Sequence, residues 1–253
     1  MRNLIYRFYE NSLERRLDHE ALPKHIGVIL DGNRRWAERK IGTTTKDGHA
    51  AGAAKILEFL GWCNELSIEV VTLYLLSTNN LSGRASAELD ELLAIIESLT
   101  SELGRSGLAK VKWVGDATGL PDSLVAALRD AQRNSKASGG LHVNLAVGYG
   151  GRKEIADAMR AIVKKHAKKG ESFEALADAL TPELIAKHLY TGGQPDPDLV
   201  IRTSGEQRIS DFLLWQSAHS EFYFEEALWP DFRRVDFLRA IRAFESRHRR
   251  FGS

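Results

Sequence analysis

Two clusters of charged and polar side chains have the composition of diphosphate-binding sites. The first cluster comprises Asp31, Gly32, Asn33, Arg34, Arg35 and Trp36. An aspartate that precedes a helix lies beside free backbone N–H groups and the positive end of the helix dipole, where phosphates also bind. Mg²⁺ commonly bridges phosphate oxygens to one or two carboxylates. The cluster therefore predicts a site for a metal-bound diphosphate, the alternative being an aspartate N-cap followed by exposed arginines.

The second cluster contains two further arginines and several hydroxyl groups. Its candidate ligand-binding residues are Arg202, Arg208, Ile209 and Ser210. Arginine binds phosphate oxygens through two parallel hydrogen bonds. Arg202 ends an apolar run, where a buried cation is costly without a partner. The cluster predicts a site for a second phosphorylated ligand, the alternative being a solvated loop with an internal Arg–Glu pair.

Further polar residues follow another apolar run and begin a helical stretch. The residues after the run that ends at Leu76 are Ser77, Thr78, Asn79 and Asn80. His49 begins a helical stretch, where it either orients a diphosphate or caps the helix. The Gly-Tyr-Gly-Gly-Arg sequence at 148–152 lacks the spacing of a dinucleotide fingerprint, so it predicts a tight turn into a helix. The Walker sequence is absent, which argues against a nucleoside triphosphatase.

The pattern of the rest of the chain predicts a scaffold that brings these residues together. Short apolar runs predict strands at 25–30, 70–76, 110–114, 142–146, 199–202 and 221–224. Helical patterns lie between them at 50–66, 85–104, 123–138, 154–169 and 182–190. This alternation predicts a single α/β domain with a central, largely parallel six-stranded sheet flanked by helices. Ligands bind such sheets at the carboxyl ends of the strands, which is where the clusters fall.

The composition argues against several other classes of protein. The chain has 35 Lys and Arg against 34 Asp and Glu, a balance that argues against a nucleic-acid partner. We interpret the basic stretch at 233–250 as a solvated or dimer-contacting face. The single cysteine, Cys63, fits a reducing compartment, and no apolar run approaches the roughly 20 residues of a membrane span. We therefore expect a cytoplasmic protein.

Residues 1–22 form a separate N-terminal segment in this interpretation. Leu4, Ile5, Phe8, Leu13 and Leu17 fall near helical spacing with arginines among them, which predicts an amphipathic helix. We expect this helix to pack on its own domain. The alternative is a peripheral contact with an anionic membrane surface.

The chain from Pro23 to Gly252 resembles the cis-prenyltransferases, the undecaprenyl diphosphate synthase family. The motifs that carry the resemblance lie at 25–37, 76–81, 147–152, 196–206, 212–216, 221–224 and 229–230. The resemblance implies a catalytic domain over 23–253, a homodimer, and an apolar tunnel for the growing chain enclosed by the sheet and helices. The chain is most similar to bacterial short-chain members that make Z,E-farnesyl diphosphate.

The resemblance also implies a role for each candidate residue. Asp31 would hold Mg²⁺ and help the allylic diphosphate to leave, and Glu221, from the same or the partner subunit, would complete the metal site. The allylic diphosphate would be bound by Gly32, Asn33, Arg34, Arg35 and His49, and isopentenyl diphosphate by Arg202, Arg208 and Ser210. Trp36, Arg84 and Ile209 would also bind substrate, Arg84 as the match to a phosphate-contacting arginine of the family. Asn80, with Ser77, Thr78 and Asn79 beside it, would position the isopentenyl unit while the released diphosphate takes the proton.

Leu75 is the residue from which we predict product length. It occupies a position where long-chain members of the family often have a small residue. A leucine that fills the tunnel there predicts a C15 product from geranyl diphosphate and one isopentenyl diphosphate. The alternatives are a long-chain synthase that makes a C50–C55 product and a non-catalytic prenyltransferase subunit that binds lipid.

Overall fold

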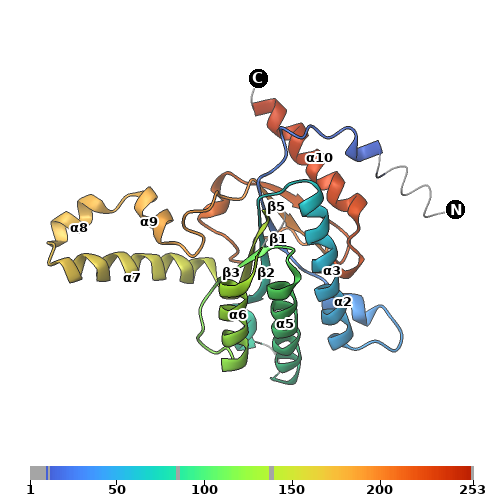
Figure 1. Ribbon diagram of the computed structural model, residues 1–253, viewed down its shortest axis with the longest axis horizontal. Coiled ribbons are helices and arrows are strands. Elements are labelled where there is room, and N and C mark those ends of the chain that lie inside the picture. The colour runs from blue at the N-terminus through green and yellow to red at the C-terminus, as the bar shows by residue number, and fades with distance from the viewer. Residues whose placement is uncertain (1–9, 11, 84–85, 137–139, 252–253) are drawn as a thin grey trace.

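Six parallel strands form the centre of the computed structural model, which describes residues 10, 12–83, 86–136 and 140–251 (Figure 1). In chain order they are β1 (His25–Ile29), β2 (Val70–Ser77), β3 (Lys110–Val114), β4 (His142–Tyr149), β5 (Leu199–Arg202) and β6 (Glu221–Phe224). Their spatial order is β3-β4-β2-β1-β5-β6, and every neighbouring pair is parallel. The prediction of an α/β fold with a six-stranded sheet is confirmed, and each predicted apolar run forms a strand.

The remaining elements are helices. They are α2 (Asn33–Glu38), α3 (Thr45–Glu65), α4 (Thr78–Gly83), α5 (Ser86–Ser106), α6 (Asp122–Asn134), α7 (Gly151–Lys169), α8 (Phe173–Ala179), α9 (Pro182–His188) and α10 (Arg234–Phe251), with 3₁₀ turns η1 (Gln216–His219) and η2 (Trp229–Asp231). The helix predicted at 123–138 ends early because Ser135 turns toward β3. Its Oγ accepts a hydrogen bond from Val111 N at 2.8 Å, which satisfies a buried donor of that strand.

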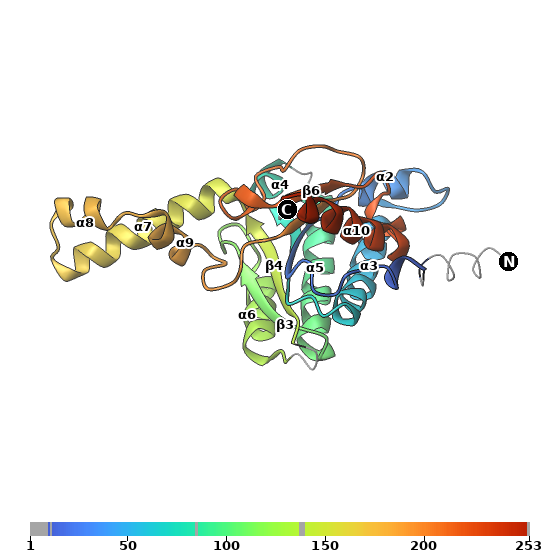
Figure 2. The same cartoon turned by 90° about the horizontal axis from the view of Figure 1, so that it is seen from above.

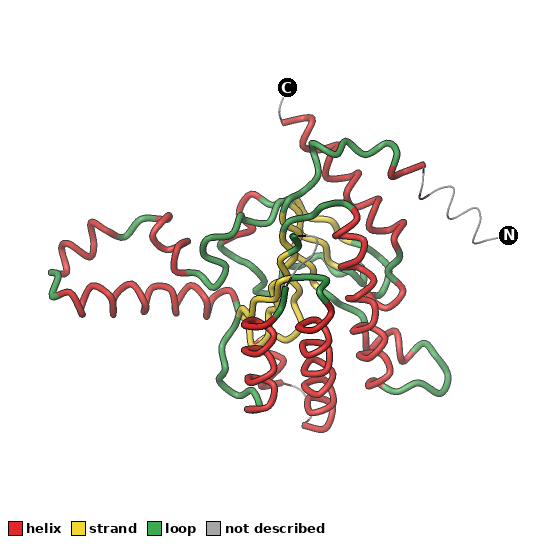
Figure 3. Tube along the Cα trace, in the orientation of Figure 1, coloured by secondary structure: helices red, strands yellow, loops and turns green. Residues whose placement is uncertain are grey.

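Alternation along the strands divides the core between the two faces of the sheet. Ile26 and Val28 of β1 belong to the larger apolar cluster, which also contains residues of α3, α5, α6 and α10. Ile29 belongs to a smaller cluster with Phe212 and Leu213, which follow β5. Successive strand residues point to opposite faces, so both clusters follow from one sequence pattern. Figure 3 shows the helical layer running beside the strands.

An arm made of α7, α8 and α9 extends away from the sheet (Figures 1 and 2). Neither α8 nor α9 contains a buried residue, and Phe173 at the start of α8 is 84% exposed. The root of α7 is buried at Glu154, whose carboxylate accepts hydrogen bonds from Tyr149 Oη at 2.5 Å and Tyr190 N at 2.8 Å. Burial raises the pKa of the Glu154 carboxyl, while these hydrogen bonds act in the opposite direction.

The N-terminal segment packs on the domain through its last apolar residues. Residues 1–9 and 11 lie outside the described part of the chain, so Leu4, Ile5 and Phe8 of the predicted amphipathic helix do too. The described part is helical only as far as Glu14, whereas the prediction extended the helix to residue 22. Leu13 and Leu17 join the larger apolar cluster. None of the helices among the described residues is long and apolar enough to cross a membrane.

Candidate active site

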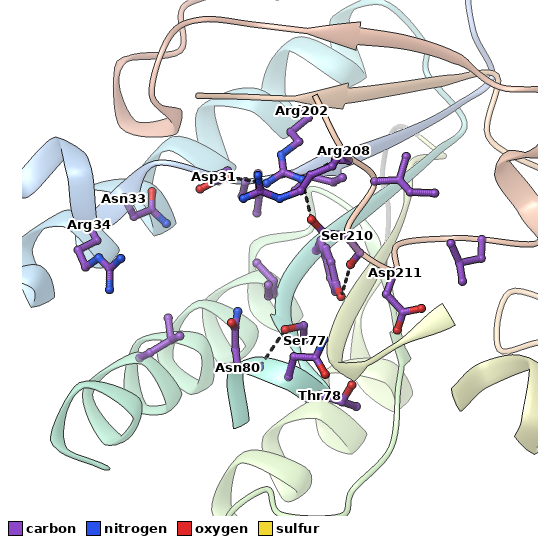
Figure 4. A pocket seen from close by; sticks show the side chains of 18 of the residues that line it. Asp31, Asn33, Arg34, Ser77, Thr78, Asn80, Arg202, Arg208, Ser210 and Asp211 are labelled. Carbon is purple, nitrogen blue, oxygen red and sulfur yellow. Dashed lines mark hydrogen bonds and ion pairs between the residues drawn. The ribbon is translucent and has the colours of Figure 1, made fainter. Parts of the chain in front are cut away.

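A pocket of about 1080 Å³ opens at the carboxyl ends of the strands. The predicted site residues that line it are Asp31, Asn33, Arg34, His49, Leu75, Ser77, Thr78, Asn79, Asn80, Arg202, Arg208, Ile209 and Ser210. Figure 4 shows Asp31, Arg202 and Arg208 on one side and Ser77 and Asn80 on the other. Because the strands are parallel, segments that are far apart in the sequence meet at this edge.

Asp31 and Arg202 form the central ion pair of the pocket. Asp31 Oδ2 lies 2.7 Å from Arg202 Nη2, and its Oδ1 lies 3.2 Å from Arg35 Nη2. Thr203 fixes the turn that carries Asp31 after β1, because its Oγ1 accepts a hydrogen bond from Asp31 N at 2.9 Å. Burial would raise the pKa of the Asp31 carboxyl, but the hydrogen bond and charge of Arg202, with the charge of Arg35, bring it below its ordinary value. The Asp31 carboxylate is therefore ionised, and each of its oxygens pairs with an arginine.

Arg202 is a buried cation whose partners all belong to the pocket. Its side chain is 4% exposed. Nη1 donates to Ser210 Oγ at 2.7 Å and to the carbonyl of Arg208, while Nη2 donates to Asp31. Nε is buried without a hydrogen-bond partner. An unsatisfied buried donor beside an open pocket favours an anionic ligand there.

Close packing of α2 against α3 places Asn33 and His49 at the same wall. Gly32 has φ +110°, and a Cβ on it would lie 2.8 Å from the side chain of Leu228. A Cβ at Gly48 of α3 would lie 2.3 Å from the Asn33 carbonyl oxygen, so the close approach of the two helices favours a glycine there. His49 is 5% exposed, and its Nε2 lies 3.8 Å from Glu88 Oε1. The close packing of α2 against α3 therefore places Asn33 and His49 side by side in the wall of the pocket.

The opposite wall comes from the end of β2 and the start of α4. Asn80 N donates to Ser77 Oγ at 3.0 Å, which fixes the first turn of α4 beside the pocket. Along β2, Tyr74 pairs with Ala146 and Leu76 pairs with Val147, so Leu75 is an extra, bulged residue. The bulge allows both Tyr74 and Leu75 to line the pocket, whereas consecutive residues of a regular strand point to opposite faces.

Leu75 also lines a smaller apolar cavity that continues from the pocket between α3 and α5. This cavity has a volume of about 40 Å³. Its apolar lining includes Ala53, Ile56, Leu75, Leu92, Ile95, Ile96, Leu99 and Trp229. A water molecule occupies roughly 30 Å³ in the liquid, so the cavity has little free space. The family resemblance implied an apolar tunnel, and the apolar cavity at this position has little free space.

Some predicted site residues do not reach the pocket. Trp36 lies on another side of α2, where its Nε1 donates to Asp231 Oδ1 at 2.8 Å and Lys40 Nζ lies 3.6 Å from the centre of its ring. The i to i+3 spacing from Asn33 does not place both side chains in the pocket, because α2 packs on η2 as well as on α3. Gly32 and Arg35 lie at the edge through their contacts with Leu228 and Asp31. Arg84 lies outside the described residues.

Glu221 is not brought beside Asp31 within one chain. It begins β6 and pairs with Leu199, whereas Ile29, two residues before Asp31, pairs with Arg202 at the other end of β5. Glu221 therefore lies toward the amino ends of the strands, and its Oε2 is 2.8 Å from Arg247 Nη1. Among the described residues, no group of three or more His, Cys, Asp or Glu side chains could hold a metal. The predicted Asp31–Glu221 metal site is not formed by one chain.

Sequence reasoning missed other residues that line the pocket. Arg152, Lys153 and Asp211 line it beside the predicted set. The sequence carried a signal for the two cations, since both directly follow the Gly-Gly turn after β4. Asp211 directly follows Ser210 of the second cluster, but its place depends on how the segment after β5 turns.

Comparison with known proteins gives a consistent result. Residues 29–252 match the model of the undecaprenyl diphosphate synthase family. The chain is 55% identical to isoprenyl transferase 1 of Streptomyces avermitilis, over 100% of this chain and 98% of the relative. It is 54% identical to a (2Z,6E)-farnesyl diphosphate synthase of Thermobifida fusca, over 98% and 97%. The crystal structure of lavandulyl diphosphate synthase from Lavandula x intermedia with dimethylallyl diphosphate superposes with a TM-score of 0.81 at 36% identity, over 89% of this chain and 96% of that one.

Proposed function

Because the chain belongs to the undecaprenyl diphosphate synthase family of cis-prenyltransferases, we propose that it condenses geranyl diphosphate with one isopentenyl diphosphate to give (2Z,6E)-farnesyl diphosphate. The observation that carries this proposal is the Asp31–Arg202 pair, which joins the two cationic clusters in one pocket that continues into an apolar cavity. Two phosphorylated substrates and an apolar product require this combination.

The match to the family's motifs implies one substrate for each cluster. The allylic diphosphate binds at Asn33, Arg34 and His49, and isopentenyl diphosphate binds at Arg202, Arg208 and Ser210. The allylic C–O bond breaks, the double bond of the isopentenyl unit attacks the allylic carbon, and a proton leaves from the new chain. Asn80 positions the isopentenyl unit, because an amide is a poor base, and the released diphosphate takes the proton. Fixed cations offset the charge that develops on the leaving group.

Mg²⁺ fits the donor chemistry of the pocket. The ionised carboxylate of Asp31 faces the pocket beside Arg202. Mg²⁺ in such sites is held by one or two carboxylates together with substrate phosphates and water. Asp31 would hold the ion in one chain. When bound, Mg²⁺ would neutralise charge on the departing diphosphate.

The experiment that tests this function is a condensation assay of the purified full-length chain. With Mg²⁺ and radiolabelled isopentenyl diphosphate, we expect geranyl diphosphate to react in preference to dimethylallyl and farnesyl diphosphates and to give a C15 product. Chelation of the metal with EDTA should abolish the reaction. A C50–C55 product would establish the long-chain alternative, and no condensation with any primer would favour a non-catalytic subunit.

Leu75 supports the short product, because it lines both the pocket and the nearly filled cavity behind it. Leu75→Ala should add at least one isoprene unit to the product, as removal of the side chain opens space for the growing chain. Chromatography of the products measures this change. Leu76→Val is the matched control, since Leu76 is fully buried in the larger apolar cluster and lines neither cavity. Identical product lengths for wild type and Leu75→Ala would refute a gating role for Leu75.

Homodimer formation is part of the proposal. The α7–α9 arm leaves Phe173 exposed, and β6 is an edge strand of the sheet with half-buried side chains. Glu221 is remote from Asp31 in its own chain, so a contribution to the metal site would come from a second copy. Sedimentation analysis is expected to give twice the 28.2 kDa chain mass, and a monomer would contradict this part. The cytoplasmic location and the peripheral membrane contact of residues 1–22 stay predictions.

A further inference from the structure

The segment that follows β5 contains four residues in left-handed backbone conformations that side-chain-bearing residues rarely adopt. They are Ser204 (φ 81°), Ser210 (φ 49°), Asp211 (φ 64°) and Leu213 (φ 45°). In the part of the chain that the structure describes, Ser67 is the only other non-glycine residue with a positive φ. Such conformations persist where surrounding contacts enforce them. The same segment carries Arg208 and Ser210 into the pocket, so those contacts bear on the site.

The N-terminus of α7 supplies one of these contacts. Gly151 N donates to the carbonyl oxygen of Asp211 at 2.7 Å, and Arg152 N donates to Asp211 Oδ1 at 3.1 Å. The first N–H groups of a helix have no partner within the helix. The N-cap residue Gly150 has no side chain that could accept from them. Asp211, 59 positions after Arg152 in the sequence, therefore caps α7.

The two glycines at the start of α7 permit this close contact. A Cβ at Gly150 would lie 2.8 Å from Asp211 Oδ2. A Cβ at Gly151 would lie 2.9 Å from the Asp211 carbonyl oxygen and 2.8 Å from Leu214 Cγ. Real Cβ atoms do not approach other atoms so closely, so a larger residue would displace the segment. The contact gives a physical reason for the Gly-Gly turn at 150–151, to which the condensation chemistry assigns no role.

The residues on both sides of Asp211 are fixed by other parts of the fold. Ser210 Oγ accepts from Arg202 Nη1 at 2.7 Å, and the Ser210 carbonyl accepts from Tyr74 Oη at 3.2 Å. Phe212 is 1% exposed in the smaller apolar cluster, and its ring stacks on Tyr74 with centroids 4.8 Å apart. Figure 4 shows Asp211 beside Ser210 at the wall of the pocket. Asp211 thus joins a buried anchor to the phosphate-binding side chains.

We propose that Asp211 is a positioning residue for isopentenyl diphosphate. By capping α7, it holds the segment in its left-handed conformation and keeps Arg208 and Ser210 directed at the diphosphate of that substrate. The role requires an acceptor at Oδ1 and does not require the negative charge. The inference rests on the proposed function, which assigns Arg202, Arg208 and Ser210 to isopentenyl diphosphate.

The test compares Asp211→Ala with Asp211→Asn in the full-length protein with Mg²⁺. Asp211→Ala should raise the KM for isopentenyl diphosphate about tenfold and leave the KM for geranyl diphosphate within about twofold, because only one phosphate site loses its geometry. Asp211→Asn keeps the acceptor and should stay within about threefold of wild type for both substrates. Gly151→Ala should reproduce the Asp211→Ala pattern without loss of the carboxylate. Ser172→Ala, which removes the side-chain cap of α8 outside the pocket, is the matched control and should change neither KM.

Three outcomes would overturn the proposal. They are an unchanged KM for isopentenyl diphosphate in Asp211→Ala, an equal loss in Asp211→Ala and Asp211→Asn, and a parallel rise of both KM values. An equal loss in the two variants would assign the effect to the charge of Asp211. A parallel rise of both KM values would assign it to a general disturbance of the fold. Calorimetric titration of isopentenyl diphosphate into the same proteins separates this proposal from the proposed function. If wild type fails to condense the substrates, the function fails, while a tenfold weaker Kd in Asp211→Ala would still support positioning.

Discussion

The two ends of strand β1 hold polar groups of opposite kinds, one fully buried and one partly exposed. At the amino end, His25 is fully buried, with Nε2 2.8 Å from Thr72 Oγ1 and Nδ1 2.7 Å from the Pro195 carbonyl oxygen. Just beyond the carboxyl end, Asp31 faces an open pocket and pairs with Arg202. One site is closed by partners of its own chain, and the other has charges directed at a space that a ligand can enter.

The electrostatics of the two ends differ in the same way. Burial lowers the pKa of His25 to about 4, although its hydrogen bond to Pro195 and the charge of Asp198 act in the opposite direction, so the ring is neutral. At the other end, Arg202 keeps the Asp31 carboxyl ionised against the effect of burial. A neutral closed network contributes to stability, whereas a charged open one can change partners when a substrate binds. Burial alone therefore does not identify a functional group. Its hydrogen-bond partners, and whether a ligand can reach it, distinguish a functional group from a structural one.

The largest effect is expected at the open end, for Asp31→Asn. We expect the condensation rate to fall on the order of 10²–10³-fold, because an amide holds Mg²⁺ poorly and no longer pairs its charge with Arg202. Steady-state assays with both diphosphates measure the loss. The matched control is Asp198→Asn at the closed end, where the carboxylate accepts from Lys24 N and His25 N. This control should lower stability by about 1 kcal/mol and leave the rate unchanged. Comparable rate losses in the two variants would refute the functional distinction.

The second effect concerns stability against pH at the closed end. Because the pKa of His25 is about 4 in the folded state and an ordinary 6.5 in the unfolded chain, the unfolded chain binds more protons between these pH values. The free energy of unfolding should therefore fall as the pH drops from about 6.5 to about 4. At 1.36 kcal/mol per pH unit, the contribution of His25 is on the order of 3 kcal/mol.

His25→Asn identifies the source of this pH dependence. The variant has no titrating ring, so its free energy of unfolding should change less than that of wild type over the same range. Urea unfolding at several pH values from 7 to 4.5 measures both curves. Parallel curves for wild type and variant would show that His25 is not the source of the pH dependence of the free energy of unfolding.

The sequence predicted both ends of β1 because each depends on local pattern. The apolar run that begins at His25 indicated the strand, and Asp31 stands at its end, where a parallel sheet places ligands. That Asp31 and Arg202 lie at one edge of the sheet followed from two such strand ends, whereas their ion pair was not predicted. These features need only strand identity and direction.

Other features of the site could not be predicted because they depend on register and on turns. Glu221 belongs to a correctly predicted strand, yet its register with β5 places it away from Asp31. Trp36 belongs to a correctly placed cluster, but α2 turns it toward Asp231. The contact of Asp211 with α7 requires positive φ values in residues that rarely adopt them. The backbone preferences of these residues therefore argue against the observed conformation. The bulge that exposes Leu75 likewise has no signal in strand alternation.

The smallest effect comes from the removal of one hydroxyl at each end, in Thr72→Val and Ser210→Ala. Thr72 Oγ1 is fully buried and lies within hydrogen-bond distance of His25 Nε2 and Asn144 Nδ2, at 2.8 and 2.9 Å. Its loss leaves these buried groups without that partner, so Thr72→Val should cost about 1–3 kcal/mol of stability and leave both KM values unchanged. Thermal unfolding and steady-state assays measure the two quantities.

Ser210→Ala should show the reverse pattern. Arg202 Nη1 keeps its hydrogen bond to the Arg208 carbonyl, so the loss of stability should stay below about 1 kcal/mol. The KM for isopentenyl diphosphate should rise several-fold, by about 1 kcal/mol of binding free energy, because the hydroxyl that orients Arg202 in the pocket is gone. If instead Ser210→Ala unfolds as readily as Thr72→Val and binds its substrate normally, the network at the pocket is structural and the contrast between the two ends of β1 fails.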